Sequence, residues 1–285
     1  MKLKPFYLLV LLLAFTKLEA QWISELGVKG GISFYYGDLA KNSTFLGTGN
    51  IHPSFFIFTH HPLTNWLGIE LEAGMSKLSA FDNNTNDQSR NRRNLNFESQ
   101  IAEANIKLML TPVQFQFGRF GPSLKAYGAL GIGVYHFNPY TYYQDEKYFL
   151  QPLGTEGQGL NGYPAPYSLT QINIPICGGL KIDIRPFSFG FEMSFRKLFT
   201  DYLDDVSDRY VQKSILEEEK GAISAALADR SPNQSLSDQP GLSPSEMPLR
   251  GQPSTGDGYG FICLKASYLF NNGQTPQKKI YCPKF

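Results

Sequence analysis

Polar or small residues alternate with apolar ones from residue 25 to residue 34. Glu25, Lys29 and Ser33 fall in one phase, whereas Leu26 and Ile32 fall in the other. Successive side chains of a β-strand point to opposite faces, so this pattern predicts a strand with one polar and one apolar face. The apolar face suits lipid, and the polar face suits the lumen of a barrel.

The same alternation returns in further segments, at 54–60, 67–76, 101–110, 123–136, 171–185, 187–196 and 258–270. Together they predict an all-β fold, a transmembrane antiparallel up-and-down β-barrel of about eight strands. The aromatic end of the last segment is similar to the terminal strand that outer-membrane barrels present for assembly. A soluble β-sandwich is the alternative, but it would not need an apolar face of lipid-spanning size on every strand.

The connections between the predicted strands alternate in length. Those at 40–51, 80–95, 138–168 and 199–257 are long and polar, whereas those at 61–65, 111–120 and 185–186 are shorter. Short periplasmic turns that alternate with long outer loops are typical of outer-membrane barrels. The longest loop contains apolar residues at helical spacing over 208–230, which predicts a helix that caps the barrel mouth, faces a partner or stays poorly ordered. Its remainder, 231–257, is rich in Ser, Pro, Gly and Gln and predicts a mobile loop.

The chain begins with the order of features found in a secretory signal peptide. Lys2 and Lys4 precede an apolar run from Phe6 to Phe15, and the segment closes on Leu18-Glu19-Ala20. We therefore expect a signal peptide at 1–20, a barrel at 21–270 and a periplasmic tail at 271–285. An N-terminal membrane anchor is the alternative, but the apolar run is too short to span a bilayer as a helix. The net charge of +1, with Lys and Arg spread along the chain, gives no case for a nucleic-acid partner.

The inward phase of the predicted strands carries charges of both signs. A barrel of about eight strands has an interior that its own side chains fill, and buried charges have to pair. We therefore expect an ion-pair core rather than a conducting pore. Its acidic members are Glu25, Glu70, Glu72, Glu103, Asp183 and Glu192, and its basic members are Lys29, Lys107, Lys125, Lys181, Arg185 and Arg196.

No enzyme or cofactor is predicted. His52, His60, His61 and His136 stand in no pattern of nucleophile, base and orienting acid. Adjacent strand histidines point to opposite faces, so His60 and His61 make a poor metal chelate. Four aspartates in the last long loop would attract a cation, but the ligand spacing of an EF-hand is missing, and a solvated acidic turn is the favoured interpretation. They are Asp201, Asp204, Asp205 and Asp208.

The three cysteines divide into two kinds. Cys177 and Cys263 fall on the inward phase of strands that are not expected to be neighbours. A disulfide between them would need an approach across the lumen, because two strand spacings exceed the reach of the bond. Cys282 lies in the tail with Lys278, Lys279 and Lys284. An odd cysteine in an oxidising compartment suggests an intermolecular disulfide or a reactive thiol, with a cysteine of no role as the alternative.

Four segments together resemble a known family. They are Gly37-Asp38-Leu39, the TEGQG block (Thr155, Glu156, Gly157, Gln158, Gly159), the TDYLDDVS block at 200–207 (with Asp201, Tyr202, Asp204 and Asp205), and Cys282-Pro283-Lys284-Phe285. The mature chain resembles the PorG-like outer-membrane barrels of the Bacteroidota type IX secretion system, a DUF6089-type family. The two loop blocks are specific in combination, whereas the first triplet alone is weak. The stretch at 231–257 is longer than the resemblance predicts.

The resemblance implies a partner rather than a substrate. PorG-like proteins are associated with a periplasmic ring of the lipoprotein PorK and its companion PorN, or GldK and GldN in gliding relatives. We accordingly expect a non-enzymatic secretion component that anchors this ring, sits among outer-membrane lipids and uses Cys282 as the attachment thiol, with Lys278, Lys279, Lys284 and Phe285 adding contacts. A surface-binding or adhesive barrel that acts through its long outer loops is the competing hypothesis.

Overall fold

The structure is a computed structural model that describes residues 24–39, 50–84, 88–118, 121–232, 235–239, 241–252 and 256–270. The predicted signal peptide at 1–20 and the predicted tail at 271–285 lie outside the described residues. The tail residues Lys278, Lys279, Cys282, Lys284 and Phe285 therefore have no structural account here.

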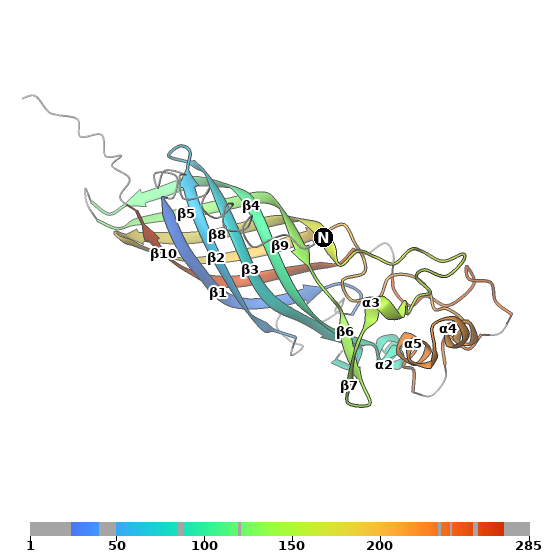
Figure 1. Ribbon diagram of the computed structural model, residues 1–285. Coiled ribbons are helices and arrows are strands. Elements are labelled where there is room, and N and C mark those ends of the chain that lie inside the picture. Colours follow the sequence, from blue (N-terminus) through green and yellow to red (C-terminus); the bar gives the residue numbers. More distant parts are fainter. Residues whose placement is uncertain are drawn as a thin grey trace, which may run out of the picture.

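Eight long antiparallel strands form one closed ring (Figure 1). They are β1 (Glu25–Tyr36), β2 (His52–Pro62), β3 (Leu67–Phe81), β4 (Asn96–Gln116), β5 (Ser123–His136), β8 (Thr170–Ile184), β9 (Phe187–Leu198) and β10 (Gly258–Leu269). Each strand pairs with its neighbours along the chain, and β1 pairs with β10 to close the ring. The predicted β-barrel is thereby confirmed, and the β-sandwich alternative is wrong because the sheet has no open edge.

The exterior of the barrel is apolar along every strand. On β5, Leu124, Leu130, Ile132 and Val134 are exposed on the outer face, whereas Tyr127 and Tyr135 are buried in the lumen. An apolar outer surface on a closed ring of hydrogen-bonded strands is stable in lipid, because the strands pair all the way round and leave no open sheet edge. The chain is therefore a transmembrane barrel of the outer-membrane type. Within the part of the chain that is described, we find no helix with the length and apolar character needed to cross a membrane.

Strand β4 contains an irregularity where its sequence requires one. Its pairing with β5 shifts between Leu110 and Val113. Pro112 lies in this interval and has no N–H to donate to the ladder, so a bulge accommodates it. Beyond the bulge β4 continues to Gln116, and it already begins at Asn96, so the strand is longer than the predicted segment 101–110 at both ends.

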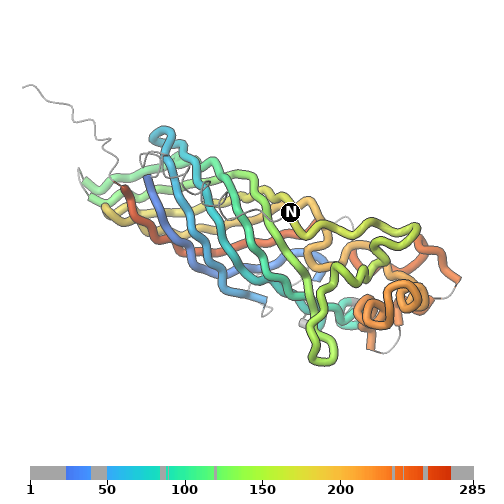
Figure 2. Tube along the Cα trace, viewed as in Figure 1, coloured from blue at the N-terminus to red at the C-terminus, as the bar shows by residue number. Residues whose placement is uncertain are grey.

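The two ends of the barrel differ in what they carry. One end, which we call the turn end, has the short connections 63–66, 117–122 and 185–186. Figure 2 shows the start of β1 and the end of β10 side by side at this end, where the Phe270 amide donates to the Ser24 carbonyl at 2.9 Å. The opposite end, which we call the loop end, carries all the shorter elements (Figure 1). They are η1 (Asp82–Asn84), α2 (Gln88–Arg93), β6 (Tyr140–Tyr143), β7 (Glu146–Phe149), α3 (Leu150–Leu153), α4 (Lys213–Glu219) and α5 (Ala222–Ala228).

The single helix predicted over 208–230 is wrong in extent. The segment forms two short helices, α4 and α5, that meet at Lys220 and Gly221. Gly221 has φ of 94°, a left-handed value that glycine adopts readily and that ends a right-handed helix. The helical spacing of the apolar residues is therefore shared by two helices that fold against each other.

We expect a charge on the lipid-facing surface to destabilise the barrel strongly. Leu130 lies near the middle of β5 and has 58% of its side chain exposed. Leu130→Arg should lower the free energy of unfolding by about 2–4 kcal/mol, because an arginine near the bilayer midplane loses its hydration. Urea unfolding in phospholipid vesicles measures this change. Leu242→Arg, at an exposed leucine of the loop end, is the matched control, and equal effects of the two changes would contradict the lipid-facing assignment.

Candidate functional site

Lys29 is the centre of the ion-pair network that fills the middle of the lumen. Its ammonium lies 2.8 Å from a carboxylate oxygen of Glu70, 2.5 Å from one of Glu72 and 2.7 Å from one of Glu192. These residues come from β1, β3 and β9, and the Lys29 side chain is almost completely buried. The alternation on each strand directs them inward, so strands far apart in the sequence contribute to one cluster.

Two further lysines bridge the same three carboxylates. Lys107 lies 2.7 Å from Glu70 and 2.8 Å from Glu72. Lys265 lies 2.8 Å from Glu70 and 3.1 Å from Glu192. Three ammonium groups therefore face three carboxylates, which balances the charge of a region that water does not reach.

A layer of similar pairs lies on the loop-end side of this cluster. The Arg196 guanidinium lies 2.5 Å from Glu103 and 3.0 Å from Glu72. The Tyr259 hydroxyl donates to the other Glu103 oxygen at 2.7 Å. Arginine presents several donors in a planar fork, so one side chain can join two carboxylates that belong to different strands.

A second, smaller group of pairs closes the turn end of the lumen. Lys181 lies 2.6 Å from Glu25, and Lys125 lies 2.7 Å from Asp183. The Ser188 hydroxyl donates to Asp183 at 2.6 Å, and the Ser267 hydroxyl donates to Glu25 at 2.7 Å. The interior is therefore occupied by paired polar groups from its turn end to its middle.

One predicted member of the ion-pair core is misplaced, and one member is missing from the prediction. Arg185 is exposed, because β8 ends at Ile184 and Arg185 belongs to the turn that follows. Its place in the alternation is inward, but the alternation no longer applies beyond the last residue of the strand. The missing member is Lys265. It stands in the inward phase of β10, between Leu264 and Ala266, so the same alternation places it in the ion-pair core.

The three glutamates around Lys29 are the closest approach to a metal site among the described residues. Ligand atoms of Glu70, Glu72 and Glu192 lie within 4.8 Å of one another. The Lys29 ammonium contacts all three carboxylates and stands where a cation would stand. The Lys29 ammonium thus supplies the positive charge that a metal ion would otherwise bring to the three carboxylates.

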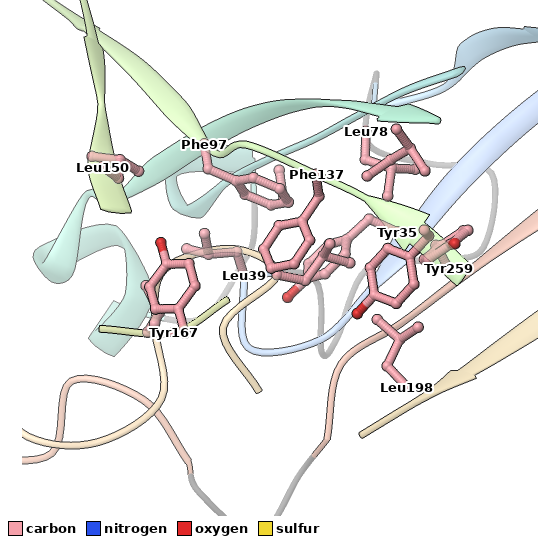
Figure 3. Close-up of a cluster of buried hydrophobic side chains, with 14 of the residues drawn as sticks. Tyr35, Leu39, Leu78, Phe97, Phe137, Leu150, Tyr167, Leu198 and Tyr259 are labelled. Atoms are coloured by element: carbon pink, nitrogen blue, oxygen red, sulfur yellow. The ribbon is translucent and has the colours of Figure 1, made fainter. Parts of the chain in front are cut away.

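An apolar cluster covers the polar lumen at the loop end (Figure 3). Tyr35, Leu78, Phe97, Leu198 and Tyr259 reach it from the barrel strands. Other members come from the loops and include Leu39, Phe137, Leu150, Tyr167, Leu203 and Val206. Side chains from the strands and from the loops are thus buried in one cluster. This burial favours a mouth that the loops close over an open vestibule.

The TEGQG and TDYLDDVS blocks contact each other above this apolar cluster. The Thr155 hydroxyl donates to Asp205 at 2.5 Å, and the Tyr167 hydroxyl donates to the same carboxylate at 2.7 Å. Glu156 accepts the backbone N–H of Ser207 at 3.0 Å. The third and fourth long loops are thus joined by buried hydrogen bonds that involve the residues quoted for the family resemblance.

The backbone of the two blocks explains their composition. Gly157 and Gly159 have φ of 76° and 87°, values that glycine adopts without strain. The turn they allow brings the Gln158 side chain back to accept the Glu156 N–H at 3.0 Å. In the other block, the Tyr202 ring stacks on Tyr167 with centroids 4.9 Å apart. These residues hold the shape of the closed mouth.

The Ser- and Pro-rich segment 231–257 contributes buried residues to this structure, so the prediction of a mobile loop over its whole length is wrong. Arg250 is buried and lies 3.0 Å from Glu156. It also donates to the backbone carbonyls of Asp205 and Ala228, at 2.5 Å and 3.0 Å. Met247 is buried as well. One arginine can satisfy several acceptors at once, so a segment without regular structure is held by a few strong contacts.

Tyr35 joins two buried carboxyl groups at the mouth. Its hydroxyl lies 2.7 Å from Asp204 and 2.6 Å from Asp257. Burial raises the pKa of both aspartates well above the ordinary range, and a neighbouring negative charge adds to this, that of Asp38 at Asp204 and that of Asp204 at Asp257. A phenol has one proton to donate, so the second short contact requires a protonated carboxyl that donates to the phenol oxygen. We call this group, Tyr35, Asp204 and Asp257, the mouth triad.

Removing the central lysine should destabilise the barrel more than removing an exposed one. Lys29→Met leaves the Glu70, Glu72 and Glu192 carboxylates short of one positive charge, which should cost about 3–5 kcal/mol of unfolding free energy. Lys213→Met is the control, because Lys213 lies 3.9 Å from Glu217 at the surface and its loss should cost about 0–1 kcal/mol. Urea unfolding in vesicles compares the two. Adding Glu72→Gln to Lys29→Met should recover part of the loss, and no difference between the two lysine variants would contradict the network.

The closed mouth should be more stable at acidic than at alkaline pH. Burial raises the pKa of Asp201 to about 7 and that of Asp205 to about 6. The folded mouth therefore binds more protons than the unfolded loop between the ordinary pKa of aspartate and about pH 7, and its stability falls as the pH rises through that window. Limited proteolysis of the 199–257 segment should be severalfold slower at pH 5 than at pH 8, after correction for the activity of the protease. Asp201→Asn should flatten this dependence, whereas a dependence that is unchanged in Asp201→Asn and Asp205→Asn would contradict the assignment.

Comparison with known proteins places the chain in a family and gives distant structural likenesses. The family model described as a domain of unknown function, DUF6089, matches residues 3–217, which includes both loop blocks. No curated protein matches the sequence. Neisserial surface protein A is similar over 86% of this chain and 96% of its own, with 7% identity and a TM-score of 0.40. Ail of Yersinia pestis is similar over 87% of this chain and 99% of its own, with 10% identity and a TM-score of 0.36.

The family expected from the loop blocks is thus confirmed at the level of DUF6089, while the barrel assignment rests on the strand pairing itself. The match ends at residue 217, so neither the segment 231–257 nor the tail is covered by it. The chain belongs to the DUF6089 family.

Proposed function

We propose that this protein is a non-enzymatic outer-membrane component of a type IX secretion system, with gliding motility as a linked output, and that it anchors the periplasmic ring. The observation that carries the proposal is the filled interior. Ion pairs occupy the lumen from Glu25 to Arg196, and an apolar cluster covers the mouth. In the part of the barrel that the structure describes, side chains fill the lumen, which favours a rigid attachment point in the membrane over conduction.

The family membership and the loop blocks add support to this proposal. The PorG-like resemblance carries the expectation of a PorK/PorN-type ring, or its GldK/GldN counterpart, as the partner. Membership of DUF6089 agrees with that resemblance without naming a function. In the proposed orientation the turn end faces the periplasm, because short periplasmic turns and long outer loops are usual for such barrels.

The C-terminal tail is the proposed attachment segment. The chain leaves β10 at the turn end, where Phe270 is hydrogen-bonded to Ser24, and continues into residues 271–285. Of the three cysteines, Cys177 and Cys263 are free thiols buried in the lumen. Cys282 is therefore the candidate for a disulfide with the ring lipoprotein, in a compartment that favours such bonds. Lys278, Lys279 and Lys284 would add attraction to an acidic partner surface, and Phe285 an apolar contact.

Non-reducing electrophoresis of native membranes tests the attachment. The wild-type chain should run as an adduct that a thiol reductant dissociates, and mass spectrometry should identify a ring lipoprotein in it. Cys282→Ser should abolish the adduct, because no other cysteine of the chain lies outside the lumen. Cys263→Ser is the matched control and should leave the adduct intact. Absence of any adduct, together with unchanged ring capture by Cys282→Ser, would overturn the tethering proposal.

A second candidate function is surface binding through the loop end, and one observation favours it. A cavity of about 410 Å³ opens between the β6–β7 hairpin and the helices α4 and α5. Its lining combines Tyr143, Gln144, Lys213 and Glu217 with the small side chains of Ala222 and Ala226. Mixed polar and apolar walls of this kind suit a small polar ligand or a peptide side chain.

Filling the cavity separates the two candidates. Ala226→Trp should fill the cavity, whose lining contains no lumen residue and no member of the mouth triad. If the tail attaches the barrel to the ring, secretion and ring capture should survive Ala226→Trp and fail in Cys282→Ser. The reverse pattern, with secretion intact in Cys282→Ser and cell adhesion lost in Ala226→Trp, would favour surface binding.

A further inference from the structure

The β6–β7 hairpin at the loop end has two faces of different character. Cross-strand pairing places Tyr140 opposite Phe149 and Tyr142 opposite Lys147. These four residues lie on one face, which we call the aromatic face, because alternate residues of a strand share a face. The other face carries Thr141, Tyr143, Glu146 and Tyr148.

The second face is already occupied by the rest of the loop end. Tyr143 and Tyr148 pack against the apolar cluster of the mouth. The Thr141 hydroxyl donates to Asn96 at 2.6 Å and receives a bond from Arg230 at 3.1 Å. The hairpin is therefore held in a fixed orientation, and that orientation turns the aromatic face away from the mouth.

The aromatic face combines two exposed rings and the buried ring of Tyr140 with a lysine. Tyr142 is 51% exposed and Phe149 is 42% exposed. The Lys147 ammonium lies 3.6 Å from the centroid of the Tyr140 ring and 4.8 Å from that of Phe149. An ammonium group over a ring face is attracted by the ring and still has N–H groups left to donate to a further partner.

This face continues the lipid-facing surface of the barrel. Tyr140 pairs with Glu98 of β4, and Glu98 lies on the outward phase of that strand. Further along β4 toward the turn end, Ala102, Ala104 and Ile106 continue the same outward phase and begin the apolar band. Between the band and the hairpin lies an outward ion pair, Lys77 with Glu98 at 2.6 Å. A change from apolar to charged residues marks the level where hydrocarbon gives way to headgroups.

The hairpin also extends away from the barrel in a suitable direction. Figure 1 shows β6 and β7 projecting sideways from the barrel axis at the loop end, and the tube in Figure 2 follows the same course. A hairpin that leaves the wall at the headgroup level and runs sideways lies over the membrane surface rather than over the mouth. We propose that the aromatic face rests on the lipid headgroups of the leaflet at the loop end, with Tyr142 and Phe149 in the interface and Lys147 bound to a headgroup phosphate.

The chemistry of the face favours lipid as the occupant. Aromatic residues, tyrosine among them, form girdles at the two membrane–water interfaces of such barrels, because the ring of tyrosine is apolar while its hydroxyl group stays hydrated. A lysine near the surface is attracted to anionic headgroups. The proposal does not depend on the function proposed above, since it requires only the barrel and the hairpin.

A spin label at position 142 tests the placement. The full chain carrying Cys282→Ser and Tyr142→Cys would be labelled and reconstituted in phosphatidylcholine vesicles that contain phosphatidylglycerol. The buried thiols of Cys177 and Cys263 should not react. Leu242→Cys, at an exposed loop-end leucine outside the hairpin, is the control. The label at 142 should be severalfold less accessible to a water-soluble nickel chelate, and equal accessibility of the two labels would overturn the proposal.

A charge reversal tests the role of Lys147. Lys147→Glu should make the label at position 142 severalfold more accessible to the chelate in vesicles with phosphatidylglycerol, but not in phosphatidylcholine alone. Lys213→Glu, on the exposed side of α4, should leave the accessibility unchanged in both. Heat-dependent electrophoretic mobility establishes that each variant is folded. A folded Lys147→Glu variant with unchanged accessibility in both lipids would remove the phosphate contact from the proposal. A label shielded from molecular oxygen, which enters lipid, as well as from the chelate would show that protein rather than lipid covers the face.

Discussion

The structure depends on the pairing of charges inside a lumen too narrow for bulk water. Six ionised side chains, Lys29 among them, meet in the middle of the lumen, with Glu70, Glu72 and Glu192 shared among three lysines. A single unpaired charge there would be very costly, so each residue constrains the others. This constraint extends to the strand register, because a shift of one residue would turn the charges toward lipid and the apolar residues toward the lumen. The network therefore ties together strands that are distant in the sequence.

The mouth is held by a different balance of interactions. Apolar rings and aliphatic side chains close the loop end of the lumen, and buried hydrogen bonds fix the loops above them. Arg250 and the mouth triad serve this purpose where regular structure is absent, since they connect loop segments that share no strand pairing. Burial raises the pKa of two carboxyl groups at the mouth, Asp201 and Asp205, so the stability of the mouth depends on pH. In the lumen, by contrast, the carboxylates are paired with lysine and arginine side chains.

The sequence contains enough information to predict the barrel because its key signal is local. Alternation along one strand assigns both faces, and Leu130 and Lys107 could be placed outside and inside from their neighbours alone. Prediction failed where local rules end. Arg185 follows the last strand residue, so phase no longer determines its direction. The contacts of Arg250 depend on loops far away in the chain, and no pattern within 231–257 reveals them. The break at Gly221 has a local signal, a glycine inside the predicted helix, that the spacing of the apolar residues alone does not register.

The loop blocks show why a recognisable motif need not mark a chemical site. Thr155, Glu156, Asp204 and Asp205 are mostly engaged with one another or with neighbouring loops, and they are buried. Residues that spend their hydrogen-bonding capacity on structure are not available to bind a partner. The groups that remain for contacts at this end lie elsewhere, on the aromatic face of the hairpin and around the cavity beside α4 and α5. A filled lumen and a structural mouth therefore leave the hairpin at the loop end, and the segment proposed for attachment after β10, as the parts of the chain free to meet a partner.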